Sequence, residues 1–528
     1  MEIREIRALR GANYYSRYPV IYMQVALGEL EEKPSDTIPG FKTRIEKILP
    51  SLIEHQCSPG HRGGFFERLD RGTWAGHIAE HIAIEIQCLA QMEVGFGKTY
   101  STDDYGIYNI VYRYRDEEVG IEAGKYAVQI VNNLFNSQET DIPPIIQRLK
   151  EIRENNLFGP STQSIVSEAN NRSIPVIRLN DDSYVQLGYG IHQRRIQATI
   201  IDTTSAIGVE IADDKKRTKD LLSGMGIPVP KGYSVETLSE ALEAAETIGY
   251  PVAIKPVSGN HGRGITTNIL SPSDLETSFQ NAKKFSEYLV VEKFLSGSDY
   301  RMLVIDGKFI AASRRDPASI VGDGKSTIQQ LVNEINLDPN RGFGHEKILT
   351  RIAIDYMTER LLSQKQLTLQ SIIPKDEKLY IKSTANLSAG GIAIDVTDEV
   401  HPMTKTIAER ISQIVGLNVI GIDLITSDHR IPLSNDNGGV IEVNAAPGFR
   451  MHVNPFEGKS KNVAGAIVDM LFPPGSKFDI PIVAVTGTNG KTTTTRLISH
   501  IIGLNGNIVG MTSTDGIVFG NDLILEGD

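Results

Sequence analysis

Two apolar stretches late in the chain carry side chains whose oxygens could bind a metal ion. Asp423 lies in GIDLI, and Glu442 and Asn444 lie two residues apart in GVIEVN. Both stretches are typical of strands, on which residues two apart share a face. Such oxygens are Mg²⁺ ligands, and a carboxylate on an apolar strand is costly unless it is paired or metal-bound. If the strands are neighbours, they form an Mg²⁺ site; the alternative is a structural ion network.

Two lysines and a glycine loop farther upstream could bind phosphate groups. Lys215 opens a basic helix start, and Lys255 ends the apolar strand VAIK. The loop that follows, SGNHGRGI, contributes Gly259, His261, Gly262, Arg263 and Gly264. Backbone N–H groups and a lysine ammonium converge well on phosphate, and the histidine and arginine of the loop would contact the transferred phosphoryl group. The alternative is a surface hairpin with a solvated lysine, since glycine patterns alone are weak.

The segment 288–308, YLVVEKFLSGSDYRMLVIDGK, is typical of an apolar strand, a polar hinge and a second strand. Glu292 lies beside backbone amides and suits an adenine slot, and Asp299 could reach a ribose. Arg301 follows the hinge and could contact the phosphoryl group, or form a strand-end salt bridge instead. Together with the lysines and the metal ligands, these residues predict binding of ATP and Mg²⁺.

A third group of candidate residues lies on one predicted helix, TWAGHIAEHIAIEIQCLAQM, at 73–92. His77 and His81 lie one turn apart, and His77-x-x-Glu80-His81 fits a pattern in which two histidines bind Zn²⁺ and the glutamate is the general base. Glu85 and His61 are the candidates for a third ligand. A zinc peptidase would follow; the alternative is a half-buried helix with hydrogen-bonded histidines.

A second candidate nucleotide site lies at PIVAVTGTNGKTTTTRL, residues 481–497. The apolar run Ile482–Val485 predicts a strand, and TTTRLISHII predicts a helix. Gly490, Lys491 and Thr492 between them would form a phosphate cradle, with the lysine on phosphate and the threonine on Mg²⁺. The loop is not a full Walker A motif, because a valine stands where that motif needs its first glycine.

Three segments must position these residues. Residues 1–158 mix short strands with helices, residues 159–473 alternate strand and helix, and a linker rich in proline and glycine precedes the cradle segment, 481–528. This pattern predicts an α+β or α/β architecture. Net charge is −11, so nucleic acid is not an expected partner, and two cysteines without a signal peptide or a long apolar run predict a cytoplasmic protein that spans no membrane.

The order of the two lysines, the glycine loop, Glu292, Asp423 and Glu442-x-Asn444 resembles the ATP-grasp ligases. Over essentially the whole chain the sequence resembles the cyanophycin synthetase family, in motifs that include CSPGHRGGF, GPSTQSIV, IKPVSGNHGRGI, TANLSAGGIAIDVTDEVHP, IEVNAAPGFRMHV and TGTNGKTTTT. The resemblance implies synthesis of multi-L-arginyl-poly-L-aspartate without a ribosome. An ATP-grasp part would add aspartate to the backbone of a primer, a Mur-ligase-like part would attach arginine, and the enzyme would form homo-oligomers.

Three residues are candidates for binding the substrate: Ser161, Ser388 in TANLSAGG, and Arg450 after AAPGF. An arginine can hold the terminal carboxylate of the polymer bidentately, and a serine with flanking amides can clamp one. Each could equally be a turn or capping residue.

The cradle segment is too short to bury its own core, so we expect the Mur-like part to be incomplete here. The chain as given should then add aspartate but not arginine. Three other functions stay open. DPASIVGDGKSTI and DPNRGFGHEK also resemble bifunctional glutathione enzymes, which suggests a glutathione-synthetase-like peptide ligase. A zinc peptidase with a degenerate ligase body and a non-catalytic nucleotide-binding partner are the others.

Overall fold

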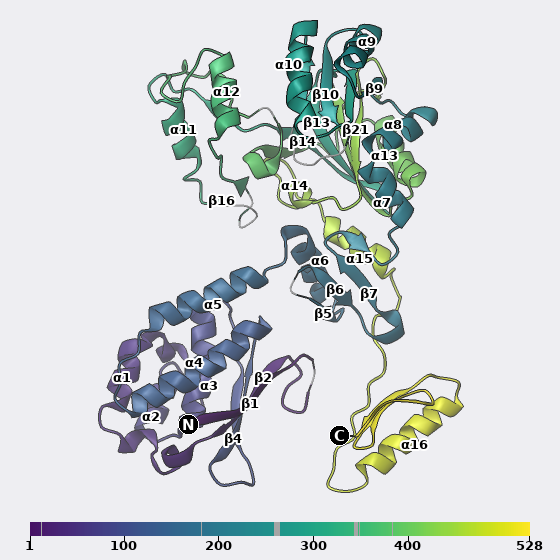
Figure 1. The fold of residues 1–528 in the computed structure, drawn as a ribbon. Coiled ribbons are helices and arrows are strands. Elements are labelled where there is room, and N and C mark those ends of the chain that lie inside the picture. The colour runs from purple at the N-terminus through teal and green to yellow at the C-terminus, as the bar shows by residue number, and fades with distance from the viewer. Residues whose placement is uncertain are drawn as a thin grey trace. The chain divides into compact units, whose positions relative to one another are not determined.

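The computed structural model describes residues 1–11, 13–180, 182–257, 264–342, 347, 349–382 and 384–527. The chain divides into two compact units, Met1–Gly159 and Pro160–Asp528, each of which is described by itself (Figure 1). The finer boundaries expected at 158, 473 and 481 stay predictions. Among the described residues, no helix is long and apolar enough to cross a membrane.

The first unit is an antiparallel four-stranded sheet with helices packed on one face. In the strand VIYMQVA, Ile21, Met23 and Val25 are fully buried on the helix side, as period-2 alternation requires. The strands, in sheet order, are β1 (Glu2–Leu9), β2 (Val20–Ala26), β4 (Ile107–Arg113) and β3 (Gly97–Ser101). The helices are α1 (Phe41–Ile48), α2 (Gly64–Asp70), α3 (Ala75–Leu89), α4 (Glu117–Phe135) and α5 (Ile142–Asn156).

Two antiparallel sheets form the main body of the second unit. The first is covered by α9 (Leu238–Ile248) and α10 (Pro272–Lys283), and the second by α7 (Ala206–Asp213), α8 (Lys215–Gly224) and α13 (Pro402–Val415). The first sheet has the order β11 (Thr266–Ile269), β10 (Val252–Pro256), β12 (Leu289–Lys293), β9 (Gly232–Val235). The second has the order β19 (Ile392–Asp395), β14 (Lys308–Asp316), β13 (Ser298–Ile305), β20 (Val419–Thr426), β21 (Gly438–Asn444).

Smaller elements complete this unit. A second four-stranded sheet contains β5 (Val176–Arg178), β6 (Tyr184–Leu187), β7 (Arg194–Gln197) and β8 (Ile200–Ile201). Two strand pairs are β15 (Ser319–Val321) with β18 (Lys378–Tyr380), and β16 (Arg341–Gly342) with β17 (Leu349–Thr350). The remaining helices of the body are α6 (Pro160–Asn171), α11 (Ile328–Ile335), α12 (Tyr356–Gln364), α14 (Arg450–Val453) and α15 (Val463–Leu471).

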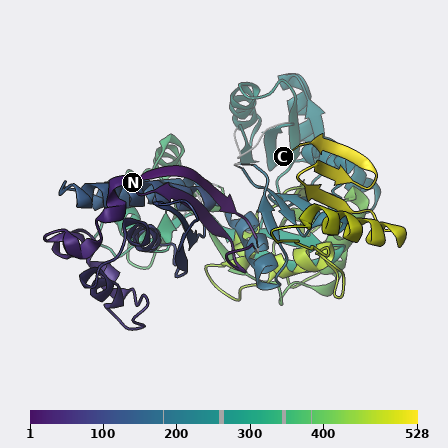
Figure 2. The ribbon, with the colours of Figure 1, turned by 90° about the horizontal axis from the view of Figure 1, so that it is seen from below.

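The last segment holds α16 (Lys491–Leu504), which runs alongside a three-stranded sheet (Figure 1, Figure 2). Its strands are β22 (Gly510–Ser513), β23 (Gly516–Phe519) and β24 (Asp522–Glu526). The helix agrees with the sequence, but the strand expected over Ile482–Val485 was wrong, because these residues are largely exposed and form no strand. A strand before a phosphate loop normally sits inside a parallel sheet, and it needs neighbours on both sides to satisfy its backbone.

Candidate functional site

A buried cluster of two lysines and one carboxylate lies on the first sheet of the second unit. Lys255 is near the end of β10, and Glu292 lies on the neighbouring strand β12. The Nζ atom of Lys255 is 2.8 Å from one carboxylate oxygen of Glu292, and Lys219 of α8 bonds the other oxygen. Only 5% of the surface of Lys255 and of Glu292 is exposed, so water screens these charges little. Lys219 was not predicted, although it lies one turn after Lys215 on the same basic helix.

The cluster holds two positive charges against one negative charge. Burial, together with the neighbouring Lys255 ammonium, lowers the pKa of Lys219 to about 7, although Glu292 opposes this shift. Burial also works against the charge of Lys255, but Glu292 holds the pKa of Lys255 above its usual value. The pKa of Glu292 is lowered, because the two lysines outweigh its burial. A further anion, such as phosphate, would complete the charge balance.

A cavity of about 820 Å³ opens beside this cluster. Its wall includes Lys215, Lys219 and Lys255 among its lysines. Apolar parts of the wall include Tyr233 of β9, Val290 of β12 and Leu295 of the segment after β12. A volume of this size, with apolar walls and a few converging cations, suits a nucleotide. Asp214 caps α8 by accepting two backbone N–H groups, which fixes the start of the helix that carries Lys215.

The predicted Mg²⁺ ligands lie together on the second sheet. The expectation that their two strands are neighbours is confirmed, because β20 pairs with β21 and places Asp423 directly across from Glu442. The Nδ2 atom of Asn444 lies 3.5 Å from Oδ2 of Asp423, and Glu442 lies 3.8 Å from the Nζ of Lys215. Two carboxylates and one amide on adjacent strands offer oxygen ligands of the kind that magnesium prefers. Lys215 thereby connects these ligands with the cavity.

Two guanidinium groups contact Asp423. Arg301, which lies across from it on β13, donates through Nε and, at 2.9 Å, through Nη2; Arg315 on β14 lies 3.3 Å away. Burial would raise the pKa of Asp423, but these two cations hold it below its usual value. The ion network that the sequence left open as an alternative is therefore present, and it includes the salt bridge considered for Arg301. A role of Arg301 on a phosphoryl group stays a prediction.

Two further residues at this place, Arg315 and His452, were not predicted from the sequence. Arg315 also binds Asp299, the predicted ribose contact, with Nε 2.7 Å from its carboxylate. Burial raises the pKa of Asp299 although Arg315 opposes it. His452 of α14 is buried, and its Nδ1 lies 2.9 Å from the hydroxyl of Ser313. Burial lowers the pKa of His452 to about 3, so the ring is neutral. No spacing rule singles out either residue, because their partners lie on other strands.

The predicted substrate residues take up structural contacts. The hydroxyl of Ser161 accepts the backbone N–H of Phe449 at 3.1 Å and so fixes the turn before Arg450. Arg450 donates to the carbonyl of Lys347 at 3.1 Å and to the hydroxyl of Thr350 at 3.2 Å. The contact of Ser161 is a turn role of the kind considered for it, whereas Arg450 joins α14 to the residues at β17. Binding of substrate by Ser161 and Arg450 stays a prediction.

Ser388 is exposed in a short 3₁₀ helix, Leu387–Ala389, and a buried arginine secures the residues next to it. Arg341 donates to the carbonyl of Thr350 at 2.6 Å and to that of Gly390 at 3.3 Å. This arginine is 6% exposed, and its Nε has no hydrogen-bond partner among the described residues. Arg341 was not predicted. It joins strand β17, which Arg450 also contacts, to the loop of Ser388.

Most of the predicted glycine loop lies outside the described residues. This applies to Gly259, His261, Gly262 and Arg263. Gly264 is described and has φ +73°, and a Cβ there would lie 2.8 Å from the ring of Phe285, so only glycine fits.

The predicted second phosphate cradle has the local form of a helix start. Gly490 has φ +76° and precedes α16, and the Nζ of Lys491 binds the carbonyl of Gly487 at 2.7 Å. The hydroxyl of Thr492 lies 3.3 Å from that of Thr514. Nucleotide binding by these three residues stays a prediction.

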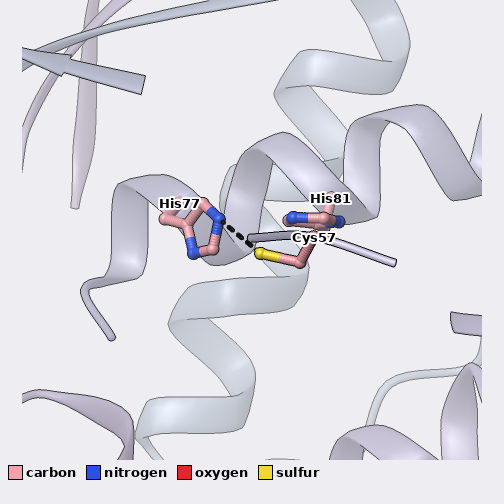
Figure 3. Close-up of side chains that lie close together, drawn as sticks. All are labelled: Cys57, His77 and His81. Atoms are coloured by element: carbon pink, nitrogen blue, oxygen red, sulfur yellow. Dashed lines mark hydrogen bonds between the residues drawn. The ribbon is translucent and has the colours of Figure 1, made fainter. Parts of the chain in front are cut away.

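The helix α3 of the first unit brings its two histidines to a cysteine from the loop before α2 (Figure 3). The ligand atoms of Cys57, His77 and His81 all lie within 4.8 Å of one another. The Sγ of Cys57 is 3.5 Å from Nε2 of His77. Burial lowers the pKa of His77 to about 4 and that of His81 well below its usual value, so both rings are in the neutral, metal-binding form.

Neither third ligand named from the sequence belongs to this group. Glu85 lies 2.8 Å from Nε2 of His55, and the more exposed His61 pairs with Glu67 at 3.1 Å. The residue that completes the group is Cys57. It lies on a loop far upstream of the helix, and no helical spacing links the two, so only the folded chain reveals it.

A second cavity, of about 900 Å³, opens over the cysteine and the histidines, and Glu80 lines it with them. Glu80 is 5% exposed and accepts a hydrogen bond of 2.7 Å from the hydroxyl of Thr99. Burial raises the pKa of Glu80 to about 7. The residues of the predicted histidine and glutamate motif therefore face one space that could admit a substrate.

Two family models match the chain. The model described as Cyanophycin synthase-like N-terminal domain matches residues 22–136, and the model of the carbamoyl-phosphate synthase L chain, ATP binding domain, matches residues 214–306. The second range contains Lys215, Lys219, Lys255 and Glu292.

Similar proteins include a cyanophycin synthetase from Crocosphaera subtropica, which is 48% identical over 536 residues, 100% of this chain and 62% of that protein. The glutathione biosynthesis bifunctional protein of Clostridium perfringens is 32% identical over 317 residues, 59% of this chain and 41% of that protein. A crystal structure of a bifunctional glutathione synthetase from Pasteurella multocida is 28% identical with a TM-score of 0.49, and the match covers 66% of this chain and 49% of that chain.

The chain spans less than two thirds of the length of the cyanophycin synthetases that it matches. The match nevertheless covers 100% of this chain. The chain is a homologue of the cyanophycin synthetases, with a cyanophycin-synthase-like N-terminal domain and an ATP-grasp fold.

Proposed function

We propose that this chain is an ATP-dependent ligase that adds aspartate to the backbone of the polymer multi-L-arginyl-poly-L-aspartate. The observation that carries the proposal is the buried cluster of Lys219, Glu292 and Lys255 beside a cavity of nucleotide size. The carboxylate strands lie next to it, and Lys215 lines the cavity and approaches Glu442. In this proposal one site would combine cations for a triphosphate with oxygen ligands for Mg²⁺.

In this reaction the protein would position the substrates and neutralise charge, and it would form no covalent bond with them. The terminal carboxylate of the polymer would attack the γ-phosphoryl group of ATP, ADP would leave, and the amine of aspartate would displace phosphate from the acyl phosphate. The lysines would hold the phosphates. Asp423, Glu442 and Asn444 would hold Mg²⁺, which offsets charge on the β- and γ-phosphates. Arg301, beside Asp423, would stabilise charge on the moving phosphoryl group.

The polymer end would lie at the loop of Ser388 and at Arg450. Both neighbour strand β17, where Arg341 and Arg450 contact Thr350. A guanidinium is a bidentate partner for the terminal carboxylate. His261 and Arg263 of the glycine loop would cover the phosphoryl group in this proposal.

The test is release of phosphate from ATP in the presence of Mg²⁺, aspartate and a short synthetic β-Asp-Arg primer, with each omitted in turn. Release should require aspartate and primer together and be lost in Lys255→Met. Lys308→Met, which changes an exposed lysine on strand β14, is the matched control and should keep full activity. Release without aspartate, or with glutathione precursors in place of the primer, would contradict the proposal. The second outcome would favour the glutathione-synthetase-like alternative.

Attachment of arginine is proposed only for a chain with a complete Mur-ligase-like part, of which residues 481–528 would be the start. Its phosphate cradle would comprise Gly490, Lys491 and Thr492. Assembly into homo-oligomers likewise stays a prediction.

We also propose a second activity, zinc-dependent cleavage of the polymer by the first unit. The contacts among Cys57, His77 and His81 favour it, because a thiolate and two neutral imidazoles are zinc ligands and three protein ligands leave one position open. Glu80, in the same cavity, would act as the general base. Cutting long chains would supply the short ends that the ligase extends.

Metal analysis and primer dependence test this second activity. The purified chain should contain zinc, and Cys57→Ser should reduce its zinc content. Glu80→Gln should keep the zinc but lose the cleavage of long polymer. Polymer synthesis by this variant should therefore need added short primer even when long polymer is present. The second activity would be ruled out if the purified chain contained no zinc and Glu80→Gln depended on added primer no more than the wild type does.

A further inference from the structure

Two hydrogen-bonded connections lead away from the histidines of α3. His81 contacts His55 through their Nδ1 atoms at 2.8 Å, and Nε2 of His55 lies 2.8 Å from a carboxylate oxygen of Glu85. On the other side, Nδ1 of His77 lies 2.9 Å from the hydroxyl of Thr73. The zinc proposal assigns no role to Glu85, His55 or Thr73.

These contacts restrict which ring nitrogens can carry protons. A carboxylate only accepts hydrogen bonds, so Nε2 of His55 must carry a proton and donate it to Glu85. With one proton per ring, Nδ1 of His55 is then an acceptor, and His81 must donate from its own Nδ1. The lone pair of His81 is left on Nε2. When Thr73 accepts from Nδ1 of His77, the lone pair of His77 is likewise on Nε2, the atom that faces Cys57.

We propose that Glu85, His55 and Thr73 are positioning residues that hold His77 and His81 in the tautomer with a free Nε2, aimed at a divalent metal ion bound with Cys57. This inference rests on the zinc site proposed above. Outer contacts of this kind fix the orientation of a ligating imidazole and raise its basicity.

The distance between the donors agrees with this reading. Zinc binds sulfur at about 2.3 Å and imidazole nitrogen at about 2.0 Å, so at a tetrahedral angle the two donors lie about 3.5 Å apart. The Sγ of Cys57 and Nε2 of His77 are 3.5 Å apart. This pair of donors thus has the spacing of a zinc centre.

His81 and Glu85 are both buried, which makes the hydrogen bonds through His55 necessary. His81 and Glu85 are 7% and 5% exposed, and the ring of Phe65 lies 4.3 Å from that of His81, centroid to centroid. A buried carboxylate without a partner is costly, and His55 supplies the partner. Packing and hydrogen bonds together leave the His81 ring a single orientation.

The experiment measures metal affinity on the full chain, by competition with a chelating dye for Zn²⁺, and the absorption spectrum with Co²⁺. Glu85→Gln should weaken Zn²⁺ binding by about 10–100-fold, the usual effect of losing an outer partner. Thr73→Val should weaken it too, whereas Thr73→Ser keeps the hydroxyl and should restore it. Glu139→Gln, an exposed carboxylate in the same unit, should not differ from the wild type. Melting in the presence of a chelator confirms that each variant is folded.

Each outcome decides one proposal. If the wild type binds metal through Cys57, with a sulfur-to-cobalt charge-transfer band, and Glu85→Gln and Thr73→Val bind it equally well, the positioning role is overturned and the zinc site stands. If the wild type binds no metal, the zinc proposal fails, and the positioning role fails with it. Should Glu85→Gln not fold, the pair Thr73→Val and Thr73→Ser decides the question.

Discussion

Removing Glu292 should destabilise the second unit far more than removing Lys219. Glu292→Gln leaves the two ammonium groups of Lys219 and Lys255 in one buried place without a counter-charge. Lys219→Met leaves Glu292 and Lys255 as a one-to-one pair. The contrast in free energy of unfolding between two single variants therefore tests whether charge balance holds this cluster.

The size of the effect follows from the distance. At 2.8 Å and an effective dielectric constant of about 20, the Lys255–Glu292 attraction is about 6 kcal/mol. Part of this is offset by desolvation, and breaking a buried pair from one side usually costs about 3–5 kcal/mol. We expect such a loss for Glu292→Gln and about 1 kcal/mol or less for Lys219→Met, which removes the lysine whose charge is least favoured.

The deficit of Glu292→Gln should shrink as pH rises. Glu292 raises the pKa values of both lysines, so without it burial and their mutual repulsion would hold these pKa values below those of the unfolded chain. The folded state would then bind fewer protons than the unfolded chain. Stability then increases with pH wherever the unfolded state binds more protons. Above pH 7, one of the two lysines can lose its proton, and the repulsion is relieved.

Urea unfolding can be followed by two signals, so that the stability of the second unit is measured separately from that of the first. The chain has one tryptophan, Trp74, which lies in the first unit, so its fluorescence reports that unit, whereas far-ultraviolet circular dichroism reports both. Glu292→Gln should shift the transition seen only by circular dichroism and leave the fluorescence transition in place. Equal destabilisation by Glu292→Gln and Lys219→Met at pH 7 would refute the charge-balance argument.

Three further predictions concern the same unit. The pKa of Lys219 is about 7 in the free site, and bound phosphates would raise it, so ATP binding should take up a proton above pH 7. ATP affinity should then weaken by at most about tenfold per pH unit, which calorimetry in buffers of different ionisation heat would show. A pH-independent Kd between pH 6 and 9 would contradict this. Asp423→Asn leaves Arg301 and Arg315 without their shared carboxylate and should cost about 3 kcal/mol in urea unfolding. It should also abolish Mg²⁺-dependent phosphate release, whereas Asp436→Asn, at an exposed position, should do neither. Arg341→Gln should raise the KM for the primer about tenfold through loss of its contacts to the Ser388 loop, while the KM for ATP stays constant; an equal change in both would place Arg341 elsewhere in the reaction.

Local pattern was sufficient for the elements that carry the site. The run VAIK ends with Lys255 on a strand, and TWAGHIAEHIAIEIQCLAQM contains the helix with His77 and His81. The alternation in GVIEVN put Glu442 and Asn444 on one face, and their expected neighbour strand with Asp423 was confirmed. These features depend on periodicity within a few residues, which the sequence states directly.

The strand over Ile482–Val485 shows the limit of that reasoning. Its apolar composition predicted a strand, yet a strand exists only where a neighbour completes its backbone hydrogen bonds. The described residues of this segment place their only sheet at β22–β24 instead.

Tertiary structure alone decided which charges meet. Arg301 and Asp423 lie 122 residues apart and become partners because β13 pairs with β20. The choice of Lys219 as a partner of Glu292 depends on how α8 lies beside the sheet, and the choice of Cys57 as the third metal-binding residue depends on a loop that crosses α3. Spacing along a chain reports which side chains share a face of one element, whereas contacts between elements are set by packing and strand register, and one sequence does not state these. The sequence by itself therefore determined the kinds of groups that this protein brings to its sites, and the fold determined which of them face one another.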